Sequence, residues 1–383
     1  MTDDMSFNKA LLPAGFADVL PPDAEIEGRL VATLLEGFGS HGYQQVKPPL
    51  LEFEATLLTG SGAAVAEQTF RLMDPESQRM MGLRADITPQ IARIASTRLA
   101  EAARPLRLSY SGQCLLVRGS QLAPERQVAQ GGIELIGPDL PQADAEIVLV
   151  AVAALAAVGV THISVDLTMP PLIPALIAHA GLKPEQQGHL SRALDRKDAA
   201  CIAAEAGPMA SLLLALLNAA GAADAALAAL GSMELPEAVR PMARRLADTV
   251  AAIRAVYPRL QLTIDPVEFR GYRYHTGIAV TIFALNSQAE LGRGGRYLCD
   301  GEEPATGITL YPDTIKDVAP KPRLRPRLFL PAGTPPELAG AMREQGYAAM
   351  TGFMPAADPA AEAERLGCTH FWRDGQIISL EGS

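Results

Sequence analysis

The sequence of 383 residues has only four cysteines, and no two of them form a Cys-x-x-Cys pair. Scattered cysteines without that spacing favour free thiols over a disulfide framework or a zinc site. The six histidines also lack the spacing of metal ligands. We therefore expect neither a metal nor another cofactor. The cysteines are Cys114, Cys201, Cys299 and Cys368.

The sequence also lacks an excess of basic residues and a run that could span a membrane. Its formal net charge is −10. A protein with an acidic net charge can bind tRNA only through a local basic patch. The densest basic stretch, 321–327, is proline-rich and indicates a linker. The most apolar run, 145–160, contains Glu146 and is short for a membrane helix. The first twelve residues show no signal-peptide pattern. We expect a cytoplasmic protein that binds neither membranes nor tRNA.

The N-terminal part contains helix and strand patterns in an order typical of an α+β fold. Apolar residues recur at helical spacing over 23–38, after two prolines and before a closing glycine. A second helix is expected over 89–102. Strands that follow one another with few helices between them predict an antiparallel sheet flanked by helices. The expected strands are 70–73, 80–84, 106–116 and 127–136.

Later residues predict a helical insertion and a second domain. A long helix over 140–158 and a strand over 162–167 precede an alanine- and leucine-rich segment that indicates several helices. Strands resume at 260–264 and 279–283. The predicted organisation is a main domain (1–169 and 257–316), a helical insertion (170–256), a linker (317–326) and a small C-terminal α/β domain (327–383).

Three blocks of sequence carry candidate chemistry, and the first comprises 15–21, 46–52 and the string 83–88, Leu-Arg-Ala-Asp-Ile-Thr. The first two segments resemble the opening of class II histidyl-tRNA synthetases, which in that family builds the dimer interface. The string is similar to the family's leucine-arginine-proline-glutamate-glycine-threonine. There the acid meets the ammonium group of the amino acid and the threonine supports it. The resemblance implies these roles for Asp86 and Thr88.

The second block is a hairpin over 108–137 that ends in Gln-Gly-Gly-Ile-Glu-Leu-Ile-Gly. In an extended strand Gln130 and Glu134 project to one face, so an amide and a carboxylate can reach one pocket. Such groups suit imidazole and ammonium recognition. The string resembles the family's glutamine-x-glycine-x-glutamate. Arg126 corresponds to a basic position of the family.

The third block is 269–277, Phe-Arg-Gly-Tyr-Arg-Tyr-His-Thr-Gly, followed by Gly-Gly-Arg-Tyr at 294–297. Both resemble the family's signature for binding histidine. Arg270 falls on the signature arginine and can hold a carboxylate bidentately. Tyr274 and His275 fall on the two signature tyrosines, so His275 implies altered specificity or hydrogen bonding.

Two positions depart from the family where it carries arginines that bind ATP. Leu116 replaces the arginine that holds the α-phosphate, and Thr314 replaces the arginine that stacks on adenine. Adenylation needs positive charge to stabilise the phosphorus centre. Each such contact is worth roughly 2.7–4 kcal/mol, so losing two predicts a slowing on the order of 10⁴-fold or more. No catalytic residues are expected.

Each of these residues alone is a weak signal. A lone Asp86 or Glu134 is more often a surface or capping carboxylate, and a lone Arg270 is usually a surface arginine. A glycine pair alone indicates only a turn. Three blocks in family order, across roughly 10–315, are specific in combination.

The decayed ATP motifs and the small C-terminal domain are similar to the regulatory subunits of ATP phosphoribosyltransferase, the synthetase-like family of histidine biosynthesis. That resemblance implies a non-catalytic dimer that assembles with a short-form catalytic subunit into a hetero-octamer and transmits allosteric feedback by free histidine. The alternatives are an active histidyl-tRNA synthetase or other amino-acid-activating ligase, and a dimeric relative that works with another partner or acceptor. The expected histidine-binding residues are Asp86, Thr88, Gln130, Glu134, Arg270, Tyr274 and His275. The expected supporting residues are Arg126, Tyr272, Gly294 and Gly295.

Overall fold

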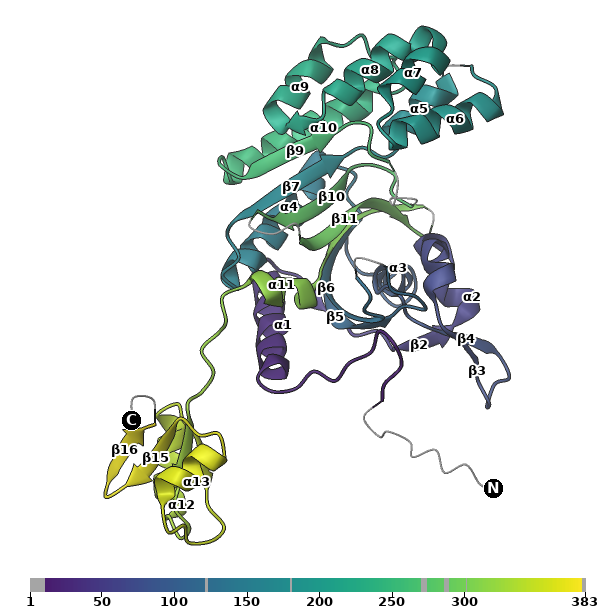
Figure 1. The fold of residues 1–383 in the computed structure, drawn as a ribbon. Helices are drawn as coiled ribbons and strands as arrows, with labels where there is room; N and C mark the ends of the chain where they lie inside the picture. The colour runs from purple at the N-terminus through teal and green to yellow at the C-terminus, as the bar shows by residue number, and fades with distance from the viewer. Residues whose placement is uncertain are drawn as a thin grey trace, which may run out of the picture. The chain divides into compact units, whose positions relative to one another are not determined.

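The structure is a computed structural model that describes residues 11–120, 123–179, 181–269, 274–285, 289–300 and 302–380. The chain forms two compact units, which divide between Pro320 and Lys321. Figure 1 shows the helices and strands along the chain. Within the described ranges, none of the helices combines the length and the apolar character needed to cross a bilayer.

A nine-stranded sheet forms the centre of the first unit, and its order over the described residues is β1-β5-β6-β12-β11-β10-β7-β9-β8 (Figure 1). Neighbouring strands are antiparallel except β1–β5 and β7–β9, which are parallel. The strands are β1 (Gln44–Gln45), β5 (Leu106–Leu115), β6 (Gln127–Ile136), β7 (Ile163–Thr168), β8 (Gly221–Ala222), β9 (Gln261–Asp265), β10 (Ala279–Ala284), β11 (Glu290–Cys299) and β12 (Glu303–Leu310).

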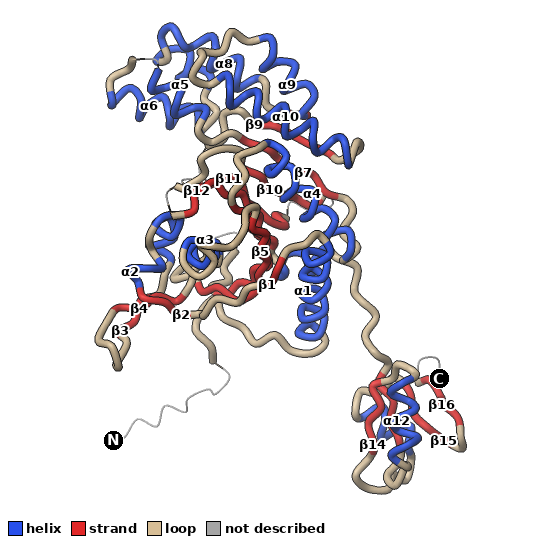
Figure 2. Tube along the Cα trace, turned by 180° about the vertical axis from the view of Figure 1, so that it is seen from behind, coloured by secondary structure: helices blue, strands red, loops and turns tan. Residues whose placement is uncertain are grey.

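Side-chain alternation gives this sheet two different faces. On β6, Ile133 and Leu135 pack into the larger hydrophobic core, whereas Ile136 packs into a separate cluster on the other face. Helices α1, α4 and α10 supply buried side chains to the larger core, and Ile91 and Ala95 of α3 belong to the second cluster. Figure 2 shows α1 and α3 on opposite sides of β5. These helices are α1 (Asp23–Ser40), α3 (Thr88–Ser96), α4 (Pro141–Ala157) and α10 (Arg240–Val256).

A helical segment lies between β7 and β9 in the chain and beside them in space (Figure 1). Its apolar side chains, including Leu176, Leu194 and Leu213, join the same core as the sheet. The helical segment is therefore part of the first unit. Its other elements are α5 (Leu172–His179), α6 (Pro184–Asp195), α7 (Ala199–Glu205), the 3-10 helix η2 (Gly207–Met209), α8 (Ala210–Asn218) and α9 (Ala223–Ser232).

A three-stranded antiparallel sheet of order β2-β4-β3 lies next to α3 in the first unit. Arg84, at the end of this sheet, leads the chain into α3. The segment thus places the string Asp86 to Thr88 at the start of a buried helix. The elements are β2 (Leu51–Phe53), α2 (Glu54–Leu57), the 3-10 helix η1 (Gly60–Gln68), β3 (Arg71–Met73) and β4 (Met80–Leu83).

The second unit has its own four-stranded sheet, of order β14-β13-β15-β16. β13 pairs in parallel with β14 and β15, and β16 runs antiparallel to β15. Helices on this sheet bury Met342 on one side and Ala363 on the other. The elements are β13 (Arg327–Leu330), α12 (Pro336–Glu344), β14 (Ala348–Thr351), α13 (Pro359–Arg365), β15 (His370–Arg373) and β16 (Gln376–Ser379).

The predicted α+β fold class is confirmed, with three differences in detail. The sheet is mixed, because the long helical crossover between β7 and β9 allows parallel pairing. The helix expected over 89–102 ends at Ser96, where the Ser96 and Thr97 hydroxyls both donate to the Arg93 carbonyl and compete with the helical bonds. Helix α11 (Pro312–Val318) extends into the stretch expected to be a linker.

Candidate functional site

Glu134 is the centre of a buried polar cluster on the α3 face of the sheet. Its side chain is 1% exposed, and its carboxyl group receives three hydroxyl donors. Thr88 Oγ1 donates to Oε1 at 2.9 Å, Tyr110 Oη donates to the same oxygen at 3.3 Å, and Tyr297 Oη donates to Oε2 at 2.9 Å. Three strands and the start of α3 thus converge on one carboxyl group.

Two glycines make room for this cluster. A β-carbon at Gly307, which pairs with Glu134 across β6 and β12, would lie 1.7 Å from Glu134 Oε2. A β-carbon at Gly132 would lie 2.5 Å from Tyr110 Oη. Real β-carbons do not approach other atoms this closely. The absence of side chains at both positions is therefore a condition for burying the carboxyl group.

Burial also sets the ionisation of the acids in the cluster. It raises the pKa of Glu134 to about 8, although the hydroxyl donors oppose the shift. Burial likewise raises the pKa of Asp86, against hydrogen bonds from the Thr88 and Ile87 backbone and from Gln130. A carboxyl group with a pKa near 8 is largely protonated at neutral pH. Burial in the cluster therefore favours the protonated, neutral form of Glu134.

Asp86 and Gln130 lie at the start of α3 and on β6, respectively. The Thr88 backbone N–H donates to Asp86 Oδ1 at 3.4 Å. Gln130 Oε1 accepts from the Ile87 N–H at 3.1 Å and from Cys114 Sγ at 3.3 Å. With its oxygen occupied in this way, Gln130 directs its amide nitrogen to the Asp86 carboxylate.

Tyr274 and His275 lie beside the Glu134 cluster. Their rings stack at a centroid distance of 4.4 Å, and the Tyr274 and Tyr297 rings meet in a T-shaped arrangement with centroids 6.1 Å apart. Burial, followed by the nearby acids of the site, raises the pKa of Tyr274 well above its usual value. A β-carbon at Gly295 would lie 2.5 Å from His275 Cδ2. The small residue on β11 thus lets the histidine ring lie against the sheet.

The expected supporting residues have different places in the structure. A β-carbon at Gly294 would lie 2.0 Å from the Gly307 carbonyl oxygen, so this glycine allows β11 and β12 to pack closely. Arg126 stacks over the Phe16 ring at 5.0 Å. Its guanidinium donates to the Leu116 carbonyl at 3.2 Å. Among its described contacts, Arg126 thus holds the N-terminal segment against the hairpin. Arg270 and Tyr272 lie outside the described residues.

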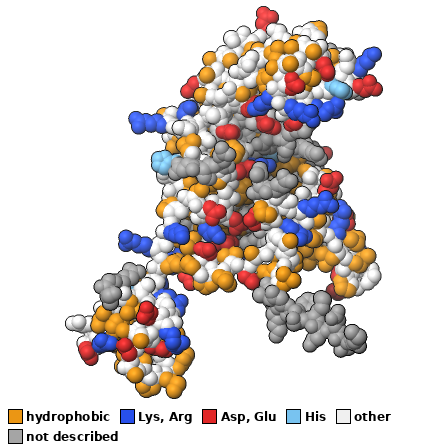
Figure 3. Space-filling view, in the orientation of Figure 1, with side chains coloured by type: hydrophobic (Ala, Val, Ile, Leu, Met, Phe, Trp, Pro, Cys, Tyr) orange, Lys and Arg blue, Asp and Glu red, His pale blue; other side chains and the backbone are white. Residues whose placement is uncertain are grey.

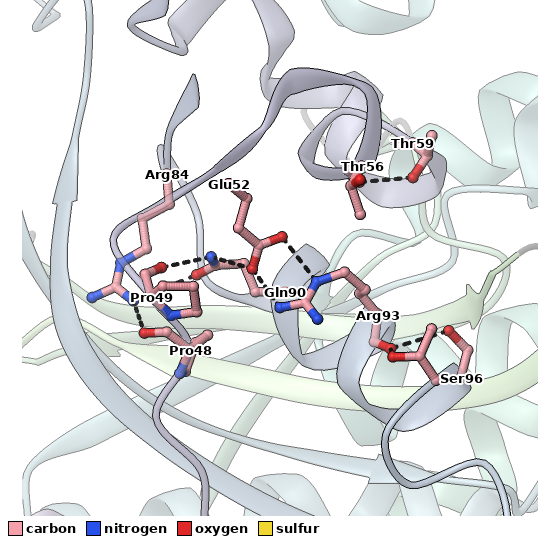
Figure 4. A network of polar contacts seen from close by, with 10 residues as sticks. Pro48, Pro49, Glu52, Thr56, Thr59, Arg84, Gln90, Arg93 and Ser96 are labelled. Atoms are coloured by element: carbon pink, nitrogen blue, oxygen red, sulfur yellow. Dashed lines mark hydrogen bonds and ion pairs between the residues drawn. The ribbon is translucent and has the colours of Figure 1, made fainter. Parts of the chain in front are cut away.

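A second polar network joins the three-stranded sheet β2-β4-β3 to α3, beside the Glu134 cluster (Figure 4). Arg84, 6% exposed, donates to the side-chain oxygen of Gln90 at 3.4 Å. Gln90 donates to Glu52 Oε1 at 2.8 Å, and Arg93 forms an ion pair with the same carboxylate. A β-carbon at Gly112 of β5 would lie 2.2 Å from Arg84 Nη2. The network ties β2, α3 and β5 together around the string that carries Asp86.

A third network links β11 to the helical segment. Arg296 is 4% exposed and pairs with Asp144, 1% exposed, at 2.8 Å. Arg245 of α10 reaches the other oxygen of Asp144 at 2.8 Å and Asp139 at 2.7 Å. The Arg296 carbonyl accepts from the Thr276 N–H at 2.8 Å. The segment that carries Tyr274 and His275 is thus anchored on a buried ion-pair network.

Comparison with known proteins places this geometry in a family. A model of the family described as histidyl-tRNA synthetase matches residues 15–315. A relative from Paramagnetospirillum magneticum, named ATP phosphoribosyltransferase regulatory subunit, is 53% identical over 376 residues, which cover 98% of this chain and 99% of the relative. Relatives with the same name from Rhodospirillum centenum and Gluconobacter oxydans are 51% and 53% identical over 383 and 372 residues. The match with the Rhodospirillum centenum relative covers 100% of this chain and 99% of that protein. The match with the Gluconobacter oxydans relative covers 97% of each.

The chain belongs to the ATP phosphoribosyltransferase regulatory subunit family.

Solved structures support the fold of this regulatory subunit family. A protein from Bacillus halodurans, described as an ATP phosphoribosyltransferase regulatory subunit/histidyl-tRNA synthetase, aligns with a TM-score of 0.81 at 22% identity, over 95% of this chain and 97% of that one. Histidyl-tRNA synthetase from Nostoc sp. aligns with a TM-score of 0.75 at 17% identity, over 94% and 90%. These likenesses establish the class II synthetase fold.

The sequence resemblance predicts ATP-binding arginines at two positions, which are Leu116 and Thr314 in this chain. Leu116 follows β5 and is half-buried, with its N–H donating to the Arg126 carbonyl at 2.7 Å. Thr314 lies on α11, which is attached to β6 because Asp313 Oδ2 accepts the Ala129 N–H at 2.8 Å. Neither side chain carries a charge.

The most important contributors to the cluster that sequence reasoning missed are Tyr110, Tyr297 and Thr309. Thr309 Oγ1 lies 2.7 Å from Tyr110 Oη and extends the hydroxyl chain to β12. Of these three residues, Tyr297 could have been found from the sequence, because it closes the Gly-Gly-Arg-Tyr string. Tyr110 and Thr309 become neighbours of Glu134 only through strand register, which no local pattern reports.

Proposed function

We propose that this chain is the non-catalytic regulatory subunit of an ATP phosphoribosyltransferase. In this proposal it assembles with a short-form catalytic subunit at the first step of histidine biosynthesis and transmits feedback inhibition by histidine. The observation that carries the proposal is the identity of 51–53% with relatives of that name over nearly the whole chain. The partner, a glycosyltransferase, performs the chemistry.

The uncharged side chains at the two ATP positions support a non-catalytic role. Leu116 and Thr314 offer no positive charge to a triphosphate. A pentacoordinate phosphorus needs such charge at a fixed distance, so adenylation would lose most of its electrostatic stabilisation. The amino-acid side of the proposed site consists of Asp86, Thr88 and Glu134, which hydrogen bonds hold together. A site of this kind can bind an amino acid without activating it.

Histidine is the ligand proposed for that half of the site. Its ammonium group would pair with the Asp86 carboxylate, and its imidazole would reach Glu134. The Glu134 oxygens already receive three hydroxyl donors. In the proposed complex a ligand nitrogen replaces one of these donors, so that Thr88, Tyr110 or Tyr297 shifts. Such a rearrangement gives the bound and free forms different structures, as an allosteric signal requires.

The charge of the chain fits protein and small-molecule partners better than tRNA. Its formal net charge is −10. On the face shown in Figure 3, Lys and Arg side chains lie in small groups among acidic side chains. Nucleic-acid binding depends on a concentrated basic surface. The assembly that we propose is a self-associated dimer, joined with catalytic subunits in a hetero-octamer.

Two experiments test the proposed function. Co-expression with a tagged short-form ATP phosphoribosyltransferase is expected to co-purify this chain at a fixed stoichiometry, and separate elution of the two proteins would contradict the assembly. Histidine-dependent exchange of pyrophosphate into ATP is expected to be absent. Appreciable exchange would instead identify an active amino-acid-activating enzyme.

A further inference from the structure

A polar cavity lies on the same sheet face as the Glu134 cluster. Its volume is about 500 Å³, within the ~300–1,000 Å³ of small-molecule sites. A row of residues runs across the sheet from the Glu134 cluster to this cavity, and each residue of the row pairs with the next on the neighbouring strand. The row is Gly132, Thr309, Arg293, Thr281, Asp166 and Thr263. The cavity lies at the β7–β9 end of this row, away from Glu134.

Strand alternation explains why this end of the face is polar. On β7, Val165 and Leu167 are buried in the larger core, so Asp166 and Thr168 point to the other side. The neighbouring strands β9 and β10 repeat the pattern, with apolar side chains in the core and threonines in the cavity. The residues that line the cavity include Asp166, Thr168, Asp265, Phe283, Glu290 and Arg293.

The Thr168 hydroxyl and the Asp166 carboxylate, which lie close together on β7, lack within the described part of the chain the hydrogen-bond partner and the ion-pair partner, respectively, that such groups normally have. Thr168 is 4% exposed, and its hydroxyl has no hydrogen-bond partner among the described residues. Asp166, two residues earlier on the same strand, accepts a hydrogen bond from the Thr263 hydroxyl. No ion pair joins Asp166 to an arginine or lysine of the described ranges. A buried hydroxyl and a carboxylate left in this state favour a polar ligand.

Two other acids in the cavity are already paired with basic side chains. Asp265 binds Lys197 at 2.6 Å, and Glu290 holds Arg293 through two contacts of 2.5 and 2.6 Å. Glu268 also lines the cavity and interacts electrostatically with Lys197. Asp166, which forms no ion pair with an arginine or lysine of the described residues, carries a charge that attracts a cation. An anion such as phosphate would meet a surplus of acids. No group of three or more possible metal ligands occurs among the described residues, so an organic cation fits better than a metal ion.

We propose that this cavity binds a small organic molecule with a primary ammonium group. The ammonium pairs with the Asp166 carboxylate and donates a second hydrogen bond to the Thr168 hydroxyl. Phe283, half-buried on β10, provides an apolar wall for the body of the ligand. The site goes beyond the proposed function, because it uses neither the residues nor the ligand of the Glu134 cluster.

Tyramine is a suitable probe, because tyrosol has the same aromatic body with a hydroxyl in place of the ammonium. We expect calorimetry or saturation-transfer NMR on the full chain to detect tyramine at millimolar concentration and to detect tyrosol at least roughly tenfold more weakly, the effect of one charged hydrogen bond. Equal binding of the two compounds, or no tyramine binding, would overturn the proposal.

Variants locate the binding. Asp166→Asn and Thr168→Val are expected to weaken tyramine binding, the first by roughly tenfold, while Thr168→Ser retains it. Glu237→Gln removes an exposed carboxylate elsewhere and is the control for general attraction to an acidic chain. Thermal unfolding checks that each variant is folded. If Glu237→Gln weakens binding as much as Asp166→Asn, or if Glu134→Gln abolishes it, the ammonium binds elsewhere and the assignment is wrong.

Discussion

Glu134 and Gly307 face each other across β6 and β12 so closely that the carboxyl group fills the place of a side chain at 307. Gly307→Ala would put a β-carbon 1.7 Å from Glu134 Oε2. The carboxyl group cannot yield without losing its three hydroxyl donors. We expect a loss of about 1–3 kcal/mol in the free energy of unfolding, typical of overpacking, measured by urea denaturation.

Gly28→Ala is the matched control for this substitution. Gly28 lies on the exposed side of α1, and a β-carbon there meets nothing within 4 Å. Alanine in a helix is more stable than glycine by about 1 kcal/mol. The control should therefore stabilise the same unit. If Gly307→Ala were also neutral or stabilising, the packing described around Glu134 would be incorrect.

The raised pKa of Glu134 predicts a specific dependence of stability on pH. The folded state holds this proton up to a pKa of about 8, whereas the unfolded chain releases it near 4.5. Between these values the unfolded state binds fewer protons, so the stabilisation from Glu134 is lost as pH rises, by at most about 1.4 kcal/mol per pH unit. Glu134→Gln has no such proton. Unfolding curves from pH 5 to 8 should show a steeper decline for the native chain, and parallel declines would refute the shift.

The ion pair between Asp144 and Arg296 is expected to be sensitive to the loss of one charge. Asp144→Asn would leave two arginines, one of them 4% exposed, without their shared carboxylate. We expect a cost of about 3–5 kcal/mol. Asp139→Asn affects the same arginines, but its side chain is 61% exposed, so its cost should stay below about 1 kcal/mol. Equal losses for both variants, in chemical denaturation, would rule out a special role for the buried aspartate.

Histidine binding provides a direct test of the Glu134 cluster as a ligand site. Calorimetry with free histidine is expected to detect binding at or below millimolar ligand. Glu134→Gln keeps the size of the side chain but cannot take a negative charge beside the imidazole, and should weaken binding by roughly tenfold or more. Glu237→Gln, on an exposed segment, should leave the affinity unchanged. Unaltered binding by the Glu134 variant would remove this residue from the pocket.

Local sequence patterns were sufficient to predict elements such as α1 and β6 and to place part of the candidate site. The apolar stripe of α1 buries Ile26, Leu30, Leu34 and Phe38 as the spacing predicts, and β6 spans the predicted residues. Strand alternation also places Glu134 on the face opposite Ile133. These features depend on neighbours within a few residues, which the sequence displays directly.

The rest of the cluster depends on contacts between distant segments. Tyr297 is 163 residues from the carboxyl group that it binds, and Thr309 is 199 residues from Tyr110. The parallel pairing of β7 with β9 likewise needs the whole helical crossover. Glu134 taken alone would be assigned to the surface, yet it is buried, because Gly307 leaves space for it. The role of that glycine follows from register, not from a turn.

We propose that an amino-acid site without activating chemistry regulates a partner enzyme. The most direct test measures ATP phosphoribosyltransferase activity of the short-form subunit alone, with this chain, and with this chain plus histidine. We predict that activity requires this chain and falls when histidine is added, and that Glu134→Gln keeps the activation but reduces the inhibition. Full activity of the catalytic subunit alone, or inhibition unchanged by the variant, would contradict the account.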